Sequence, residues 1–216
     1  MDKINAEKIF TSLNEMFPSL KSELNFSTNF ELFVAVILSA QCTDKRVNII
    51  TKELFANYNT PEKIAAMNVN ELENIIRSCG LYKSKAKNII ACSKKLLEKH
   101  SGVVPSDLES LIELDGVGRK TANVIRAVAF KEPAIAVDTH VFRVANRIGL
   151  TSAKNVTQSE NQLMKLLSKD KWIDWHFLLV IFGRYHCTAR NPKCSTCKIN
   201  EKCKYYNEVV KKDVRR

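Results

Sequence analysis

Apolar residues recur at helical spacing over most of the chain, and no alternating apolar–polar run extends beyond a few residues. The clearest pattern runs over 83–100, where apolar residues share one face and lysines occupy the opposite face. The same reasoning predicts helices over 31–41, 47–55, 71–79, 106–113, 162–167 and 172–185. Ser106 and Glu109 fit a capping box at the start of one of them. The sequence therefore predicts an all-α protein.

Composition narrows the class of partner. The 216 residues include 34 Lys+Arg and 23 Asp+Glu, and the resulting net charge of +11 favours an anionic partner, nucleic acid first. A merely soluble basic protein would carry the same excess. No apolar stretch is long enough to cross a bilayer, and the N-terminus lacks a secretory signal. We expect a cytoplasmic, nucleoid-associated protein with no membrane partner. The chain ends in a short basic run, 211–216, that we expect to be frayed.

A tight glycine turn opens a predicted helix at residues 116–119. Gly116 and Gly118 let the chain reverse and let another backbone approach closely, and Val117 lies between them. The amides of this turn and of the helix start, at Arg119, could bind a DNA phosphate without reading base sequence. An ordinary connection between two helices also uses glycines, so the motif alone leaves both interpretations open.

Lys120 falls in the first turn of that helix, where the helix dipole disfavours a cation. With Arg119 beside it and partial burial, this placement would favour the neutral amine. A neutral amine is a nucleophile that can form a Schiff base. A solvated surface lysine is the ordinary alternative.

Asp138 follows an apolar run, 134–137, and precedes another helical pattern. Local rules make it a helix N-cap. Both roles can coexist, because a capping carboxylate is fixed and ionised and could stabilise positive charge developing on a sugar. His140 lies two residues on and could line the same site, with core packing or a surface position as the alternatives.

Seven cysteines fall into two groups. Three are scattered among apolar neighbours and are predicted to be small core residues: Cys42, Cys79 and Cys92. Four crowd the C-terminus with the spacing Cys-x6-Cys-x2-Cys-x5-Cys: Cys187, Cys194, Cys197 and Cys203. Four thiolates this close can surround one metal centre, and a single Cys-x2-Cys pair favours iron–sulfur over zinc. Zinc and unligated cysteines remain the alternatives.

Four segments taken together closely resemble the endonuclease III family, which comprises bifunctional DNA glycosylases of the helix-hairpin-helix superfamily. They are Leu38–Asp44, Gly80–Ala86, Leu114–Asn123 and Ala136–Val144. The resemblance runs from about residue 22 to the last cysteine, and the cysteine spacing matches the cluster motif of the family. It implies a two-lobed helix-hairpin-helix glycosylase fold with a C-terminal iron–sulfur cluster loop. A six-helix domain would span 22–132, and residues 1–21 plus 133–216 would form the cluster domain, with DNA in the groove between them.

The resemblance also implies roles for single residues. Lys120 would attack C1′ of a damaged nucleotide, and Asp138 would assist departure of the base. Gln41 would fill the gap left by the extruded base, and Leu81 would wedge into the base stack, which suits an amide and an apolar side chain. Phosphate and backbone contacts would come from Gly116, Val117, Gly118, Arg119, His140, Arg190 and Lys193.

The implied reaction is excision of an oxidised pyrimidine from damaged double-stranded DNA, followed by β-elimination that nicks the strand on the 3′ side of the abasic site. The implied cofactor is a 4Fe–4S cluster with a structural role, held by the four C-terminal cysteines, in a protein that acts as a monomer. Rival readings are a monofunctional adenine-type glycosylase, which typically lacks the hairpin lysine, a non-catalytic DNA-binding protein and an electron carrier. One departure from the family is Asp115, where proline is frequent. A carboxylate beside a phosphate-binding turn should weaken DNA affinity unless it points away.

Overall fold

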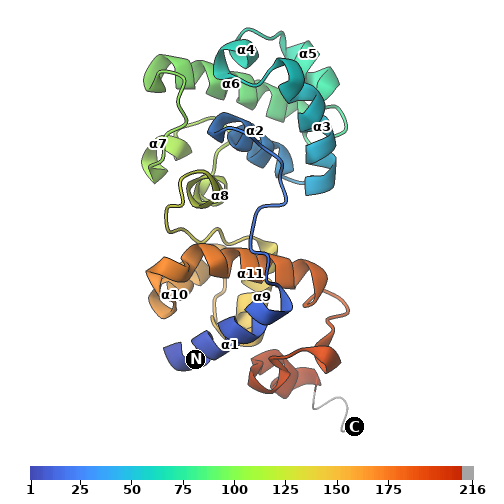
Figure 1. The fold of residues 1–216 in the computed structure, drawn as a ribbon, viewed down its shortest axis with the longest axis vertical. Helices are drawn as coiled ribbons and strands as arrows, with labels where there is room; N and C mark the ends of the chain where they lie inside the picture. Colours follow the sequence, from blue (N-terminus) through green and yellow to red (C-terminus); the bar gives the residue numbers. More distant parts are fainter. Residues whose placement is uncertain (211–216) are drawn as a thin grey trace. The chain divides into compact units, whose positions relative to one another are not determined.

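The structure, a computed structural model that describes residues 1–210, is built from helices, and it contains no strand within that range. The all-α prediction is therefore confirmed. The chain divides into two compact units (Figure 1). We call Ser22–Glu132 the hairpin unit and Met1–Lys21 with Pro133–Arg216 the terminal unit. The basic run 211–216 lies outside the described residues. Within them, no helix combines the length and apolarity needed to cross a membrane.

The hairpin unit is organised around one buried helix, α2, in which every side chain from Phe30 to Leu38 is buried. This helix packs against α3, α6 and α8, as Figure 1 shows. Apart from Glu31, the stretch from Phe30 to Leu38 is apolar on every side, as expected for a helix surrounded by others. The unit's helices are α2 (Asn29–Ser39), α3 (Asp44–Asn57), α4 (Pro61–Ala65), α5 (Val69–Ile75), α6 (Tyr82–His100), α7 (Leu108–Ile112) and α8 (Arg119–Ala129). These are seven helices where the resemblance implied six, and α4 and α7 are single turns of five residues.

Several helix boundaries differ from those predicted; α3, for example, extends beyond the predicted 47–55 at both ends. The helix predicted over 31–41 ends at Ser39, because Gln41 takes a left-handed conformation with φ 53°. The helix predicted over 71–79 ends at Ile75, and the N–H of Cys79 donates instead to the carbonyl of Ile76 in a tight turn. The predicted capping box is replaced by a single cap at Asp107, whose carboxylate accepts the N–H of Ser110 at 2.8 Å.

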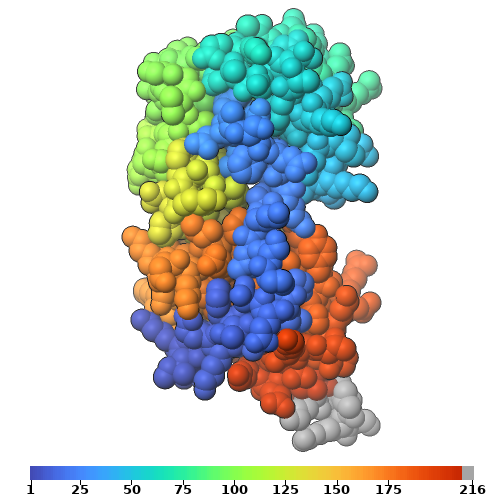
Figure 2. Space-filling view, in the orientation of Figure 1, coloured from blue at the N-terminus to red at the C-terminus, as the bar shows by residue number. Residues whose placement is uncertain are grey.

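The terminal unit packs around α11 (Trp172–Tyr185), which coincides with the predicted helix over 172–185. Helix α1 (Lys3–Met16) lies along it, and the rings of Phe10 and Trp175 have centroids 5.2 Å apart. In the space-filling view, the N-terminal residues in dark blue lie against orange residues of the same unit (Figure 2). The remaining helices are α9 (Thr139–Ile148) and α10 (Val156–Leu166), with short helical turns over 169–171, 194–196, 200–202 and 206–210. The segment predicted as helix, 162–167, falls largely within α10, which starts earlier because Asn155 caps it.

Candidate functional site

The glycine turn joins α7 to α8 and leaves the first turn of α8 without a capping side chain. Gly116 has φ +76°, a left-handed conformation that only glycine adopts without strain. The Val117 side chain is buried, and its N–H donates to the carbonyl of Leu114 at 3.0 Å. Gly118 occupies the N-cap position with extended backbone and no side chain. The start of α8 is therefore a rigid backbone surface suited to an anion.

Gly116 and Gly118 should respond differently to the same substitution. A Cβ at residue 116 would lie 2.3 Å from Asn88 Nδ2 of α6, and the positive φ of this residue would add strain for any side chain. A Cβ at residue 118 would have no neighbour within 4 Å. We expect Gly116→Ala to lower the free energy of unfolding by about 1–3 kcal/mol. Gly118→Ala should cost less than about 1 kcal/mol, the loss of a tolerable N-cap. Chemical denaturation measures both.

The second half of this prediction concerns DNA. The space beyond Gly118 is where a phosphate would approach, so the added methyl group should weaken duplex binding of Gly118→Ala although the fold is intact. Equal duplex affinity of Gly118→Ala and wild type, measured by fluorescence anisotropy, would count against a phosphate at this turn.

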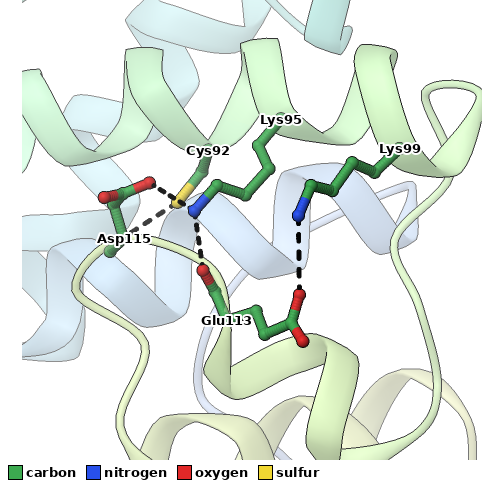
Figure 3. Close-up of polar contacts among 5 residues, drawn as sticks. All are labelled: Cys92, Lys95, Lys99, Glu113 and Asp115. Atoms are coloured by element: carbon green, nitrogen blue, oxygen red, sulfur yellow. Dashed lines mark hydrogen bonds and ion pairs between the residues drawn. The ribbon is translucent and has the colours of Figure 1, made fainter.

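The carboxylate of Asp115, next to the glycine turn, is paired with a cation. Its carboxylate pairs with Lys95 of α6 at 3.1 Å, and the same ammonium donates to the backbone carbonyl of Glu113 at 2.7 Å (Figure 3). The Cys92 thiol donates to the carbonyl of Asp115 at 3.1 Å. Burial raises the pKa of Cys92 to about 12, which keeps it a neutral donor. Helix α6 thus binds the turn and neutralises its carboxylate.

Lys120 is the second residue of α8, in the first helical turn as predicted. Its side chain is exposed in the structure, so the expectation of partial burial is wrong. Residues 119 and 120 point outward because the buried face of α8 begins at Ala122 and continues through Asn123, Ile125, Ala127 and Val128. An exposed primary amine beside an uncapped helix start can reach a substrate bound at the turn.

Gln41 and Leu81 are brought together in the hairpin unit although forty residues separate them. Both are exposed and both have left-handed backbone, with φ 53° and 59°. A Cβ at Gly80 would lie 2.9 Å from the carbonyl oxygen of Gln41, so only glycine lets the two loops touch. Non-glycine residues held in this conformation are strained, and such strain concentrates at functional sites.

Lys85 holds the first of these loops, and sequence reasoning missed it. Its side chain is buried, and its ammonium donates to the carbonyls of Leu38 at 2.8 Å and Ala40 at 2.5 Å. Burial lowers the pKa of this lysine. The ammonium satisfies carbonyls at the end of α2 and so fixes the backbone that carries Gln41.

Asp138 caps α9 in the terminal unit, and that prediction is confirmed. Its Oδ1 accepts the N–H of Val141 at 2.8 Å, and the side chain is half-buried. His140 lies in the first turn of the same helix, with Nδ1 3.3 Å from an Arg143 guanidinium nitrogen. The carboxylate is therefore fixed by the backbone and has a second oxygen with which to act.

The four C-terminal cysteines line one cavity of the terminal unit, together with Arg147 of α9. Arg147 donates to the Cys187 sulfur at 3.7 Å and to the carbonyl of Thr188 at 2.7 Å. Its neighbour one turn away, Arg143, donates to the carbonyl of Cys187. A cation beside the thiols suits a group with net negative charge, as a cluster held by four thiolates has. These residues fit an iron–sulfur cluster.

Sequence reasoning missed Arg143 and Arg147, although two arginines four residues apart on a predicted helix were a readable signal. Burial raises the pKa of the Cys197 thiol to about 11, and it raises the pKa of Cys194 and Cys203 as well. Loading a cluster must therefore release protons. Within residues 1–210, no three His, Cys, Asp or Glu side chains converge on a site for a single metal ion.

Arg190 and Lys193 lie on the loop between the first two of these cysteines. Both side chains are exposed. Arg147 donates to the carbonyl of Ala189 on this loop at 2.8 Å, and the backbone N–H of Lys193 donates to the backbone carbonyl of His186 at 3.1 Å. Arg190 and Lys193 are therefore two exposed cations on a loop whose backbone is held by hydrogen bonds.

Two family models match the chain. Residues 34–169 match the HhH-GPD superfamily of base excision DNA repair proteins, and residues 187–203 match the iron–sulfur binding domain of endonuclease III. The second match begins and ends at a cysteine of the set described above.

Relatives and a solved structure agree with these matches over nearly the whole chain. Endonuclease III of Rickettsia conorii is 50% identical over 92% of this chain and 95% of its own length. Endonuclease III of Haemophilus influenzae is 46% identical over 97% of this chain and 99% of its own. A trapped endonuclease III–DNA covalent intermediate superposes with a TM-score of 0.93 at 44% identity, covering 97% of this chain and 99% of that one. The chain belongs to the endonuclease III family of base excision DNA repair proteins, and its cofactor is the 4Fe–4S cluster of that family.

Proposed function

We propose that this chain removes oxidised pyrimidines from duplex DNA through a Schiff base on Lys120 and then cleaves the abasic site by β-elimination. Membership of the family makes it a base excision repair enzyme, a DNA glycosylase with abasic-site lyase activity. The observation that carries the finer proposal is an exposed amine in the first turn of α8, directly after the glycine turn. A similar endonuclease III has been trapped as a covalent DNA intermediate, and a covalent intermediate needs such a nucleophile.

The chemistry follows from two side chains. The Lys120 amine attacks C1′ of the damaged nucleotide, and the base leaves with the electrons of the glycosidic bond and takes up a proton. Opening of the sugar gives a cationic Schiff base, and the Asp138 carboxylate stabilises the positive charge that develops. Loss of a C2′ proton expels the 3′ phosphate and breaks the strand. Water then hydrolyses the imine and restores Lys120.

DNA binding is assigned to the backbone of the glycine turn, to exposed side chains and to the half-buried His140. The 116–119 turn and Arg119 hold a phosphate, and Gln41 and Leu81 enter the duplex. Arg190, Lys193 and His140 contact the DNA backbone. Cys187, Cys194, Cys197 and Cys203 are the proposed cluster ligands. When bound, the cluster cross-links this loop and stabilises it. We further propose that the enzyme acts as a monomer in the cytoplasm, associated with the nucleoid.

Product analysis tests the function directly. The holoprotein is incubated with a duplex that contains one oxidised pyrimidine, with and without borohydride, and with an undamaged duplex as control. Release of the free base, a nick 3′ to the site and a borohydride-stabilised adduct are the expected products. Base release without an adduct would indicate a monofunctional glycosylase, and binding with no product from any oxidised pyrimidine would contradict catalysis on this substrate class.

The loop cations should account for part of the salt dependence of DNA binding. We expect Arg190→Ala and Lys193→Ala each to reduce the slope of log affinity against log salt by about one, because each phosphate contact releases counterions. Lys198→Ala is the matched control, since that lysine lies on the same loop system but already pairs with Glu15 at 3.0 Å. Filter binding to undamaged duplex at several salt concentrations measures the slopes. An unchanged slope in both variants would remove this loop from the interface.

A further inference from the structure

Two cysteines outside the cluster set meet beneath the loops that carry Gln41 and Leu81. Cys42 directly follows Gln41, and Cys79 lies two residues before Leu81. Both are free thiols, and Cys42 lies close enough to Cys79 to add to the effect of burial in raising the pKa of the Cys79 thiol. Cys79 is buried, whereas Cys42 is half-exposed and can be reached from solvent. The prediction that both are small core residues is confirmed for Cys79 only.

The two backbone segments that carry this pair are closely packed. Gly80 lies so close to Gln41 that an added Cβ would be 2.9 Å from its carbonyl oxygen and 3.7 Å from its Cβ. The buried Lys85 ammonium fixes the carbonyl of Ala40 on one side of the contact. Two loops from distant parts of the sequence are therefore held together at the position of the two thiols.

Two cations, Lys85 and Arg46, interact electrostatically with the pair. Burial raises the pKa of Cys79 to about 11, and the cations of Lys85 and Arg46 act in the opposite direction. The same lysine also interacts electrostatically with Cys42. The thiolate is the reactive form in disulfide exchange. Burial outweighs the cations at Cys79, so the half-exposed Cys42 is the thiol placed to react first with an oxidant from solvent.

We propose that Cys42 and Cys79 form a reversible disulfide with a low-molecular-weight disulfide as oxidant, and that this bond weakens DNA binding by displacing Gln41 and Leu81. The chemical half of this inference stands on the thiol pair alone. The effect on DNA rests on the proposed function of the two loops.

The exchange balances in two steps. The Cys42 thiolate attacks one sulfur of the oxidant, forms a mixed disulfide and releases one small thiol. The Cys79 thiolate then attacks the Cys42 sulfur and releases the second small thiol. The protein loses two protons and two electrons, and the oxidant gains them as two thiols. A small thiol in excess reverses both steps.

We infer that closure of the bond shifts the loops. A disulfide holds its two sulfurs about 2.0 Å apart and its two Cα atoms about 4.4–6.8 Å apart. Gly80 already touches Gln41, and both Gln41 and Leu81 have left-handed backbone, so a bond between the residues beside them acts on a contact that is already tight. Displacements of about 1 Å can cost up to a hundredfold in function, and we expect at least about a tenfold loss of affinity.

The test uses the cluster-loaded protein with glutathione disulfide or reduced glutathione, without oxygen. Proteolysis without reduction, followed by mass spectrometry, should recover one linked peptide pair containing Cys42 and Cys79. Affinity for a duplex with a stable abasic-site analogue should fall about tenfold and return on reduction. The visible absorbance of the cluster should stay constant, which separates this effect from cluster damage.

Single variants make the assignment specific. Cys42→Ser and Cys79→Ala should bind DNA as tightly as reduced wild type and should lose the response to oxidant. Cys92→Ala should keep the response, because Cys92 is buried and its thiol donates to the Asp115 carbonyl.

Two outcomes would overturn the inference. One is that both cysteines remain alkylatable after oxidation or carry only glutathione, and the other is that the linked protein binds DNA as tightly as the reduced one. Failure of the proposed function has a different signature, since reduced wild type would then fail to bind the abasic duplex at all.

Discussion

We expect Lys120→Ala to lose the borohydride-stabilised adduct and to excise the base more slowly by a factor of about ten thousand or more, because the amine proposed to attack C1′ is gone. Its affinity for a duplex with an abasic-site analogue stays close to wild type, since the backbone of the 116–118 turn is unchanged. Lys120 is exposed and buries nothing, so the fold should not respond. Single-turnover excision and gel analysis of the adduct measure the loss.

A matched lysine is available as control. Lys83 is the second residue of α6, as Lys120 is of α8, and it is also exposed. Lys83→Ala should still form the adduct. Lys120→Arg, which keeps the positive charge but has no nucleophilic amine, should fail as completely as the alanine variant. An adduct in Lys120→Ala, or its loss in Lys83→Ala, would place the nucleophile elsewhere.

What could be predicted from the sequence is what depends on neighbours along the chain. Helical periodicity predicts the bounds of α6 to within one residue and both bounds of α11 correctly, because the apolar face of each helix repeats locally. Gly116 was predicted as a turn glycine and has φ +76°. Asp138 was predicted as a cap, and it accepts the N–H three residues ahead. Each of these features is decided within about one helical turn.

What could not be predicted is what distant segments do to one another. The sequence predicts that Asp115 weakens DNA affinity, because no residue near it in the sequence indicates that Lys95 of α6 pairs with its carboxylate. The helix predicted over 31–41 ends at Ser39. Lys85, which lies far along the chain, donates to the carbonyls at this helix end, and the local sequence does not indicate that contact. The Cys42–Cys79 contact has the same origin. Local patterns carry no information about such contacts, since packing in three dimensions decides them.

Substitution of Asp138 can affect both the stability of α9 and the proposed reaction, and the two effects must be measured separately. Its Oδ1 accepts the N–H of Val141, so part of any loss on substitution will come from the cap of α9. Asparagine caps a helix as well as aspartate does, but it carries no charge. We therefore expect Asp138→Asn to keep the thermal stability of wild type and to lose about a hundredfold to a thousandfold in excision rate.

Asp138→Ala supplies the comparison. It loses both the charge and the cap, so it should show the same catalytic loss together with about 1 kcal/mol less stability. Single-turnover rates and thermal unfolding of the cluster-loaded proteins give the two quantities independently. If Asp138→Asn were as active as wild type, while Asp138→Ala lost activity only in proportion to its stability, capping would be the whole role of this carboxylate. A rate loss shared by both variants, with the stability loss confined to alanine, assigns the charge of Asp138 to the reaction.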